Sequence, residues 1–192
     1  YDIAGGAVNV RTGGTVTGKS KGHLEVEVGV FNVRSIDDAA TPVSVFDPDN
    51  LQVNVVDLND NAGSTLSLIA DGNLNFFGVS AHAPVELISQ SGSILFGDVT
   101  APQVTMHSAS GVGTQQQVTV TTDRLTAYSF GGNVSVGVNG GFSGDVVEVN
   151  YMAASGDTGL TLTRLDAPLD GQAGEDGVVK LKALGGYIGR VG

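Results

Sequence analysis

The stretch Gly-Asn-Leu-Asn-Phe at residues 72–76 returns as Gly-Ser-Ile-Leu-Phe at 92–96 and as Gly-Asn-Val-Ser-Val at 132–136. Between the last two copies, Gly-Val-Gly at 111–113 stands where a further copy is expected to begin. A motif that recurs about every 20 residues is typical of a β-solenoid, in which each repeat forms one coil. This repeat predicts the fold more strongly than any other part of the chain.

A second motif, of alternating apolar residues, repeats in step with the first. Its copies are Leu-Ser-Leu at 66–68, Val-Glu-Leu at 85–87, Val-Thr-Met at 104–106 and Leu-Thr-Ala at 125–127. This alternation indicates a strand with one buried face in each period. Pro42, Pro84 and Pro102 each stand directly before such a strand, where a missing N–H is tolerated. Two short strands per period, with no helical periodicity, predict an all-β chain.

We predict a right-handed parallel β-helix with coils of about 20 residues. Stacking joins the few apolar side chains of each coil into continuous rows and pairs the strand backbones. We expect one elongated domain over residues 1–192, with the clearest repeats at 50–165 and irregular ends at 1–22 and 165–192. Residues 31–42 interrupt the period and are expected to be an insertion. A β-sandwich, which also has alternating strands between short turns, is the alternative fold.

Composition narrows the range of functions. The 192 residues carry a formal net charge of −11, with 9 Lys and Arg against 20 Asp and Glu. This balance argues against binding to nucleic acid, which needs a basic surface, and to anionic lipid. Cys is absent, which excludes disulfides, zinc–thiolate sites and thiol catalysis. No long apolar run occurs, so we expect no membrane span, and the start at Tyr1 without Met is interpreted as a processed product or an excised fragment.

The pattern of strand, Gly-Asn or Gly-Ser turn, and strand at 72–76, 92–96 and 132–136 resembles the repeats of filamentous-haemagglutinin-type exoproteins and autotransporter passengers. The resemblance covers roughly residues 50–165. It implies a right-handed parallel β-helix on a bacterial surface, used in adhesion, contact-dependent competition or biofilm structure. The repeats of that family hold no active-site residues that could be transferred to this sequence.

We therefore predict a non-enzymatic, secreted or cell-surface protein with a structural or adhesive role. It would be a segment of a surface fibre or a filament subunit that stacks head-to-tail on itself or on adjacent solenoid repeats, because terminal coils expose unpaired backbone groups. Host or surface glycans are expected partners, and no cofactor is expected except calcium. Two alternatives stay open: a carbohydrate-active β-helix, either a lyase or a tailspike-like hydrolase, and a calcium-dependent β-sandwich adhesion or fibre module.

The candidate calcium site consists of Asp57, Asn59, Asp60 and Asn61. Their side-chain oxygens follow one another closely along the chain, as the ligands of calcium loops do. A solvated turn rich in Asp and Asn produces the same pattern without a metal. Calcium binding and simple turn formation are therefore the two competing interpretations of this segment.

Residues 13–20, Gly-Gly-Thr-Val-Thr-Gly-Lys-Ser, match the phosphate-binding P-loop pattern. A P-loop needs a buried strand before it and a helix after it. The residues that follow Ser20 alternate as a strand, so we interpret the match as a Gly- and Thr-rich turn. His23, His82 and His107 lack the spacing of metal ligands and are expected at the surface.

The carbohydrate-active alternative has few candidate residues. Arg124 and Arg164 are the basic side chains that a lyase could use as its base. Trp is absent, so Tyr128, Tyr151 and Phe130 are the rings that could stack on a sugar. The sequence contains no Gly-x-Ser-x-Gly and no His-Glu-x-x-His motif, and we predict that the chain is not an enzyme.

Overall fold

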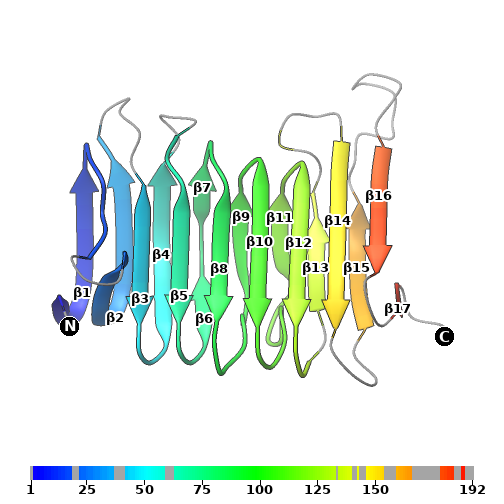
Figure 1. The fold of residues 1–192 in the computed structure, drawn as a ribbon, viewed down its shortest axis with the longest axis horizontal. Coiled ribbons are helices and arrows are strands. Elements are labelled where there is room, and N and C mark those ends of the chain that lie inside the picture. Colours follow the sequence, from blue (N-terminus) through cyan, green and yellow to red (C-terminus); the bar gives the residue numbers. More distant parts are fainter. Residues whose placement is uncertain are drawn as a thin grey trace.

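The computed structural model describes residues 2–18, 22–36, 42–58, 63–132, 134–139, 142, 146–153, 159–165, 178–183 and 187–188. Its 17 strands stack as coils of about 21 residues in a parallel β-solenoid (Figure 1). Every pairing between these strands is parallel. The predicted fold class is therefore confirmed and the β-sandwich alternative is wrong, whereas the handedness of the coil stays a prediction.

Two parallel sheets run along the solenoid. Sheet A contains, in ladder order, β1 (Ile3–Thr12), β2 (Leu24–Ser35), β4 (Leu51–Leu58), β6 (Leu74–Phe76) with β7 (Val79–Ala81), β9 (Gly97–Thr100), β11 (Val118–Thr121), β13 (Val134–Val138), β15 (Gly159–Leu165) and β17 (Tyr187–Ile188). Sheet B contains the start of β2, then β3 (Val43–Asp47), β5 (Leu66–Ala70), β8 (Val85–Ser89), β10 (Gln103–Ser108), β12 (Arg124–Ser129), β14 (Val146–Ala153) and β16 (Val178–Ala183). Successive coils thus lie side by side from β1 to β17 (Figure 1).

The two sequence motifs lie on two ladders of the solenoid. In sheet B, the second motif pairs position by position at Leu66, Val85, Val104 and Leu125. The first motif is joined by isolated parallel bridges between Leu74, Ile94, Val112 and Val134. The spacing of both motifs is therefore the length of one coil, as the sequence predicts.

The core lies between the two sheets and consists of side-chain rows that run along the solenoid. Inward and outward positions alternate along each strand because the side-chain period of a strand is two. One buried row of sheet B is Val45, Leu68, Leu87, Met106 and Ala127. Each coil contributes only a few such side chains, so its burial depends on the coils on either side.

A second inward row, of small or polar side chains, lies at the C-terminal ends of the strands of sheet B. Its members are Asp47, Ala70, Ser89, Ser108 and Ser129. The Ser108 Oγ accepts the Gly111 N–H at 2.8 Å and the Ser129 Oγ accepts the Gly132 N–H at 3.0 Å. These hydroxyls hold the turns that follow the strands, because they satisfy backbone groups that the ladder leaves free.

Asp47 is expected to make the stability of the solenoid decrease as the pH rises above the ordinary aspartate value. Burial is the largest cause that raises the pKa of its carboxyl above 3.8; the N–H groups of Asp49 and Val28 lower this pKa, and the carboxylates of Asp49 and Glu27 raise it further. The folded state therefore holds the proton more tightly than the unfolded chain, so the free energy of unfolding decreases as the pH rises above 3.8 and through the raised pKa of Asp47.

Asp47→Ser, which reproduces Ser89 of a later coil, tests this prediction. Urea unfolding midpoints of both proteins at about pH 4 and about pH 7 should show a smaller decrease for the variant, because its hydroxyl does not ionise. An equal decrease in both proteins would show that other carboxyls set the pH dependence.

Residues 1–22 and 31–42 are more regular than the sequence predicts. β1 pairs with β2 in one register from Ile3↔Val26 to Thr12↔Ser35, so the expected irregular end forms part of a coil. Residues 31–35 belong to β2 and are not an insertion, while 37–41 lie outside the described residues. The alternation was hidden in β1 because glycines at 5 and 6 carry no side chain that marks a face. Residues 165–192 likewise contain β16 and β17, and 166–177 lie outside the described residues.

Candidate functional site

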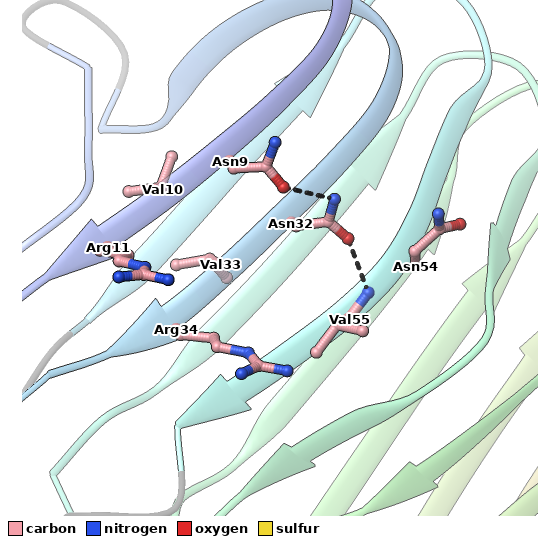
Figure 2. Close-up of a pocket in the computed structure, with 8 residues that line it drawn as sticks. All are labelled: Asn9, Val10, Arg11, Asn32, Val33, Arg34, Asn54 and Val55. Atoms are coloured by element: carbon pink, nitrogen blue, oxygen red, sulfur yellow. Dashed lines mark hydrogen bonds between the residues drawn. The ribbon is translucent and has the colours of Figure 1, made fainter.

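An open groove lies on the outer face of sheet A, across β1, β2 and β4 (Figure 2). Its volume is about 400 Å³. The residues that line it are Asn9, Val10, Arg11, Asn32, Val33, Arg34, Asn54 and Val55. A volume of this size is in the range of small-molecule sites.

Two asparagines form a ladder along the groove. The Asn32 Nδ2 donates to the Asn9 Oδ1 at 2.9 Å, and the Asn32 Oδ1 accepts the Val55 N–H at 2.9 Å (Figure 2). A bulge in β4 makes the second bond possible, because Phe31 pairs with Val53 but Asn32 pairs with Val55. The stacking of three coils therefore holds these amides in place.

Two arginines form a second ladder beside the asparagines. Arg11 pairs with Arg34 in the register of β1 and β2, and Asp57 takes the next rung on β4. Both arginines are exposed, and neither forms an ion pair with a carboxylate of the described residues. Adjacent rungs are about 4.8 Å apart, so two like charges face each other at a cost in free energy.

The groove combines two kinds of recognition chemistry. A guanidinium presents N–H donors in a planar fork that matches a carboxylate. An asparagine amide both donates and accepts hydrogen bonds, as a hydroxyl group does. Among the described residues that line the groove, none is an acid, a histidine or a nucleophile. The groove therefore offers the donors and acceptors that an anionic, hydroxylated ligand needs.

The structure places only one member of the candidate calcium site. Asp57 is half-buried near the end of β4, with Val56 and Leu58 pointing into the core on either side of it. Asn59, Asp60 and Asn61 lie outside the described residues. Within the described ranges, no group of three or more His, Cys, Asp or Glu side chains could hold a metal ion. Calcium binding at this loop stays a prediction.

The P-loop match lacks the structural context of a nucleotide site. It follows β1, most of whose residues are exposed, and it leads into the strand β2. The Gly14 N–H donates to the Thr12 Oγ1 at 2.9 Å, which is the bond of a tight local turn. Lys19 and Ser20 lie outside the described residues. The interpretation as a turn agrees with the elements on both sides.

Two of the three histidines are less exposed than the sequence predicts. The His107 ring lies 4.7 Å from that of Tyr128, and the His23 ring lies 5.2 Å from that of Phe46, measured between centroids. Both histidines are half-buried, whereas His82 is exposed. Burial lowers the pKa of His107, and the carboxylate of Glu86 opposes this effect. These contacts arise between coils, so the order of residues along one strand does not reveal them.

The residues considered for sugar chemistry are dispersed along the solenoid. Tyr128 lies on the outer face of sheet B against His107, and Phe130 is exposed in the turn after β12. Arg124 begins β12 and is exposed. The side chains of Tyr151 and Arg164 are not among those described. Tyr128, Phe130 and Arg124 do not line the groove on sheet A.

Sequence reasoning missed the groove although a signal for it is present. Asn-Val-Arg occurs at residues 9–11 and again at 32–34, and the two asparagines are 23 residues apart, which is one coil. The first copy lies in the segment that was expected to be irregular, and the second in the segment that was expected to be an insertion. Recognition of the repeat therefore required the strand register.

Comparisons with known proteins do not add a relative. No family matches the chain. No curated protein and no solved structure matches it either. Among the residues with a described structure, no helix has the length and apolar character needed to cross a bilayer. The resemblance to filamentous-haemagglutinin-type repeats and autotransporter passengers thus stays a prediction.

Proposed function

We propose that the protein is a non-enzymatic structural or adhesive solenoid of an extracellular surface. It would act as a segment of a surface fibre or as a subunit that assembles end to end. The observation that supports this proposal most is the uninterrupted parallel ladder from β1 to β17, in which each coil pairs with the next (Figure 1). Stacked coils form an elongated body with extended outer faces, which suits spacing and contact.

β1 offers the surface on which further stacking would occur. Within the described part of the chain β1 pairs with β2 alone, so the backbone groups on its other edge have no strand partner. Val8 and Val10 pack only partly against the core at this end. A further parallel strand, from another coil or from a second copy, would pair these backbone groups and cover both valines.

Negative-stain electron microscopy of the purified chain, with calcium and with chelator, tests the proposal. Filaments are expected for a subunit, and isolated rods are expected for a segment of a longer fibre. If filaments form, Val10→Lys should prevent them because it places a charge where the next coil would bury Val10. The matched control is Gln90→Lys, which adds the same charge at an exposed turn position.

Two results would contradict the proposal. Compact particles without an elongated axis would contradict the role as a fibre element. Release of products from an acidic polysaccharide by the purified chain would contradict the non-enzymatic role and favour the carbohydrate-active alternative.

A further inference from the structure

We propose that the groove on sheet A binds an acidic sugar of a surface glycan, a ring that carries one carboxylate and several hydroxyl groups. Arg11 and Arg34 would hold the carboxylate, and the amides of Asn9, Asn32 and Asn54 would hold the hydroxyls. This inference rests on the proposed adhesive function and names the ligand class that such a function would use.

The groove is built from one motif used twice. Asn-Val-Arg recurs one coil apart, and the parallel register places Asn9 beside Asn32 and Arg11 beside Arg34. On the third coil the pattern changes, because the bulge in β4 brings Asn54 into the groove and Asp57 takes the arginine position. The basic part of the groove is therefore limited to two rungs, which suits one carboxylate better than a row of them.

Among the described residues of this ladder, the arginine pair has one carboxylate neighbour, Asp57 beside Arg34. The sequence has 20 Asp and Glu against 9 Lys and Arg, yet neither Arg11 nor Arg34 forms an ion pair with a described carboxylate. A ligand carboxylate that lies between the two guanidiniums would relieve their mutual repulsion. It would also accept charge-assisted hydrogen bonds from both planar forks.

The asparagine amides keep hydrogen-bonding capacity for a ligand. Asn32 uses one N–H and its carbonyl oxygen within the ladder, which leaves its second N–H and the Nδ2 group of Asn9. The Asn54 Oδ1 accepts a bond of 3.2 Å from the Gln52 Nε2, which leaves the Asn54 Nδ2. Hydroxyl groups, which donate and accept, match this set better than an apolar ligand does.

The charge of the whole chain argues against a polyanion in this groove. A formal net charge of −11 repels nucleic acid, heavily sulfated polymers and acidic peptides. A sugar with a single carboxylate carries little charge relative to its many polar groups. The groove volume of about 400 Å³ is also of the order that a small ligand needs.

The inference is tested by titration of the full chain with D-glucuronate, with binding measured by isothermal titration calorimetry and by ligand-detected NMR. D-glucose lacks the carboxylate, and acetate lacks the hydroxyls. The affinity for each should therefore be lower than that for glucuronate by a factor of about 10 or more. Binding of glucuronate should weaken with added salt, because exposed guanidiniums are screened.

Variants assign the binding to the groove. The double variant Arg11→Gln with Arg34→Gln should lose about 10-fold or more of the glucuronate affinity. The matched control, Arg124→Gln, removes an exposed arginine at the start of β12 in sheet B and should leave the affinity unchanged. Circular dichroism and the melting temperature would show that both variants keep the fold.

Four results would overturn the inference. They are an absence of saturable glucuronate binding, equal affinity for glucose, equal affinity for acetate, and tighter binding of a poly-glutamate peptide. The last would indicate an acidic protein as the partner. The groove opens on the outer face of sheet A but includes β1, at whose free edge stacking is proposed. The single variant Arg34→Gln changes β2 alone, so filament or rod formation by this variant tests the fibre role independently of sugar binding.

Discussion

Gly97→Ala is expected to destabilise the solenoid by about 2–3 kcal/mol, as overpacking of a tight core does. A Cβ atom at position 97 would overlap the ring of Phe76, which is fully buried between the sheets. The ring cannot shift aside because the coils on both sides pack against it. Chemical unfolding of the variant measures the loss directly. Gly78→Ala is the control, because a Cβ there meets only an ordinary contact with the Asn54 carbonyl oxygen.

Removal of the Phe76 ring is expected to destabilise the solenoid more than the added methyl group at position 97 does. Phe76→Ala should lower the free energy of unfolding by about 3–5 kcal/mol, because it leaves a cavity in the core that the neighbouring coils cannot close. The double variant Gly97→Ala with Phe76→Ala should lose less than the sum of both single losses, since the new methyl group occupies space that the ring has vacated. Strictly additive losses would show that the two positions do not share this space.

Leu87→Asp is expected to lower the free energy of unfolding by more than about 4 kcal/mol and to unfold the coils around β8. Leu87 is fully buried in a row of apolar side chains, between Leu68 and Met106. The control Thr126→Asp places the same charge on the outer face of the same sheet, and we expect it to stay within about 1 kcal/mol.

Hydrogen exchange would show how this damage spreads. Coils contact only their neighbours, so protection should fall first in β5, β8 and β10 and least in distant coils. An unfolding midpoint of Leu87→Asp equal to that of Thr126→Asp would contradict the placement of Leu87 in the core.

The coil length and the sidedness of the strands could be predicted because both are local properties of the sequence. The period between Leu66, Val85, Val104 and Leu125 is the coil length, since equivalent positions pair rung to rung. The same reasoning failed in the first coils, where consecutive glycines in β1 interrupt the alternation. An expected irregular end therefore became a strand in register with β2.

For the candidate sites too, residues close together along the chain could be predicted, and residues on different coils could not. Asp57 was predicted to bind calcium because Asn59, Asp60 and Asn61, close to it along the chain, also carry side-chain oxygens; these three residues lie outside the described residues. The Asn and Arg pairs of the groove were missed because each pair is separated by a whole coil. Their proximity depends on the register and on the bulge in β4, which no local pattern encodes.

By itself, the sequence determined parallel stacking, the coil length and which side chains of the regular strands face the core. Periodicity along one chain is sufficient for these properties, because each coil repeats the same strand and turn chemistry. Only the tertiary structure decided that Arg11 faces Arg34, that Phe76 fills the space above Gly97 and that Asp47 is buried. These contacts join different coils, and a register shift of a single residue would turn each side chain to the other face.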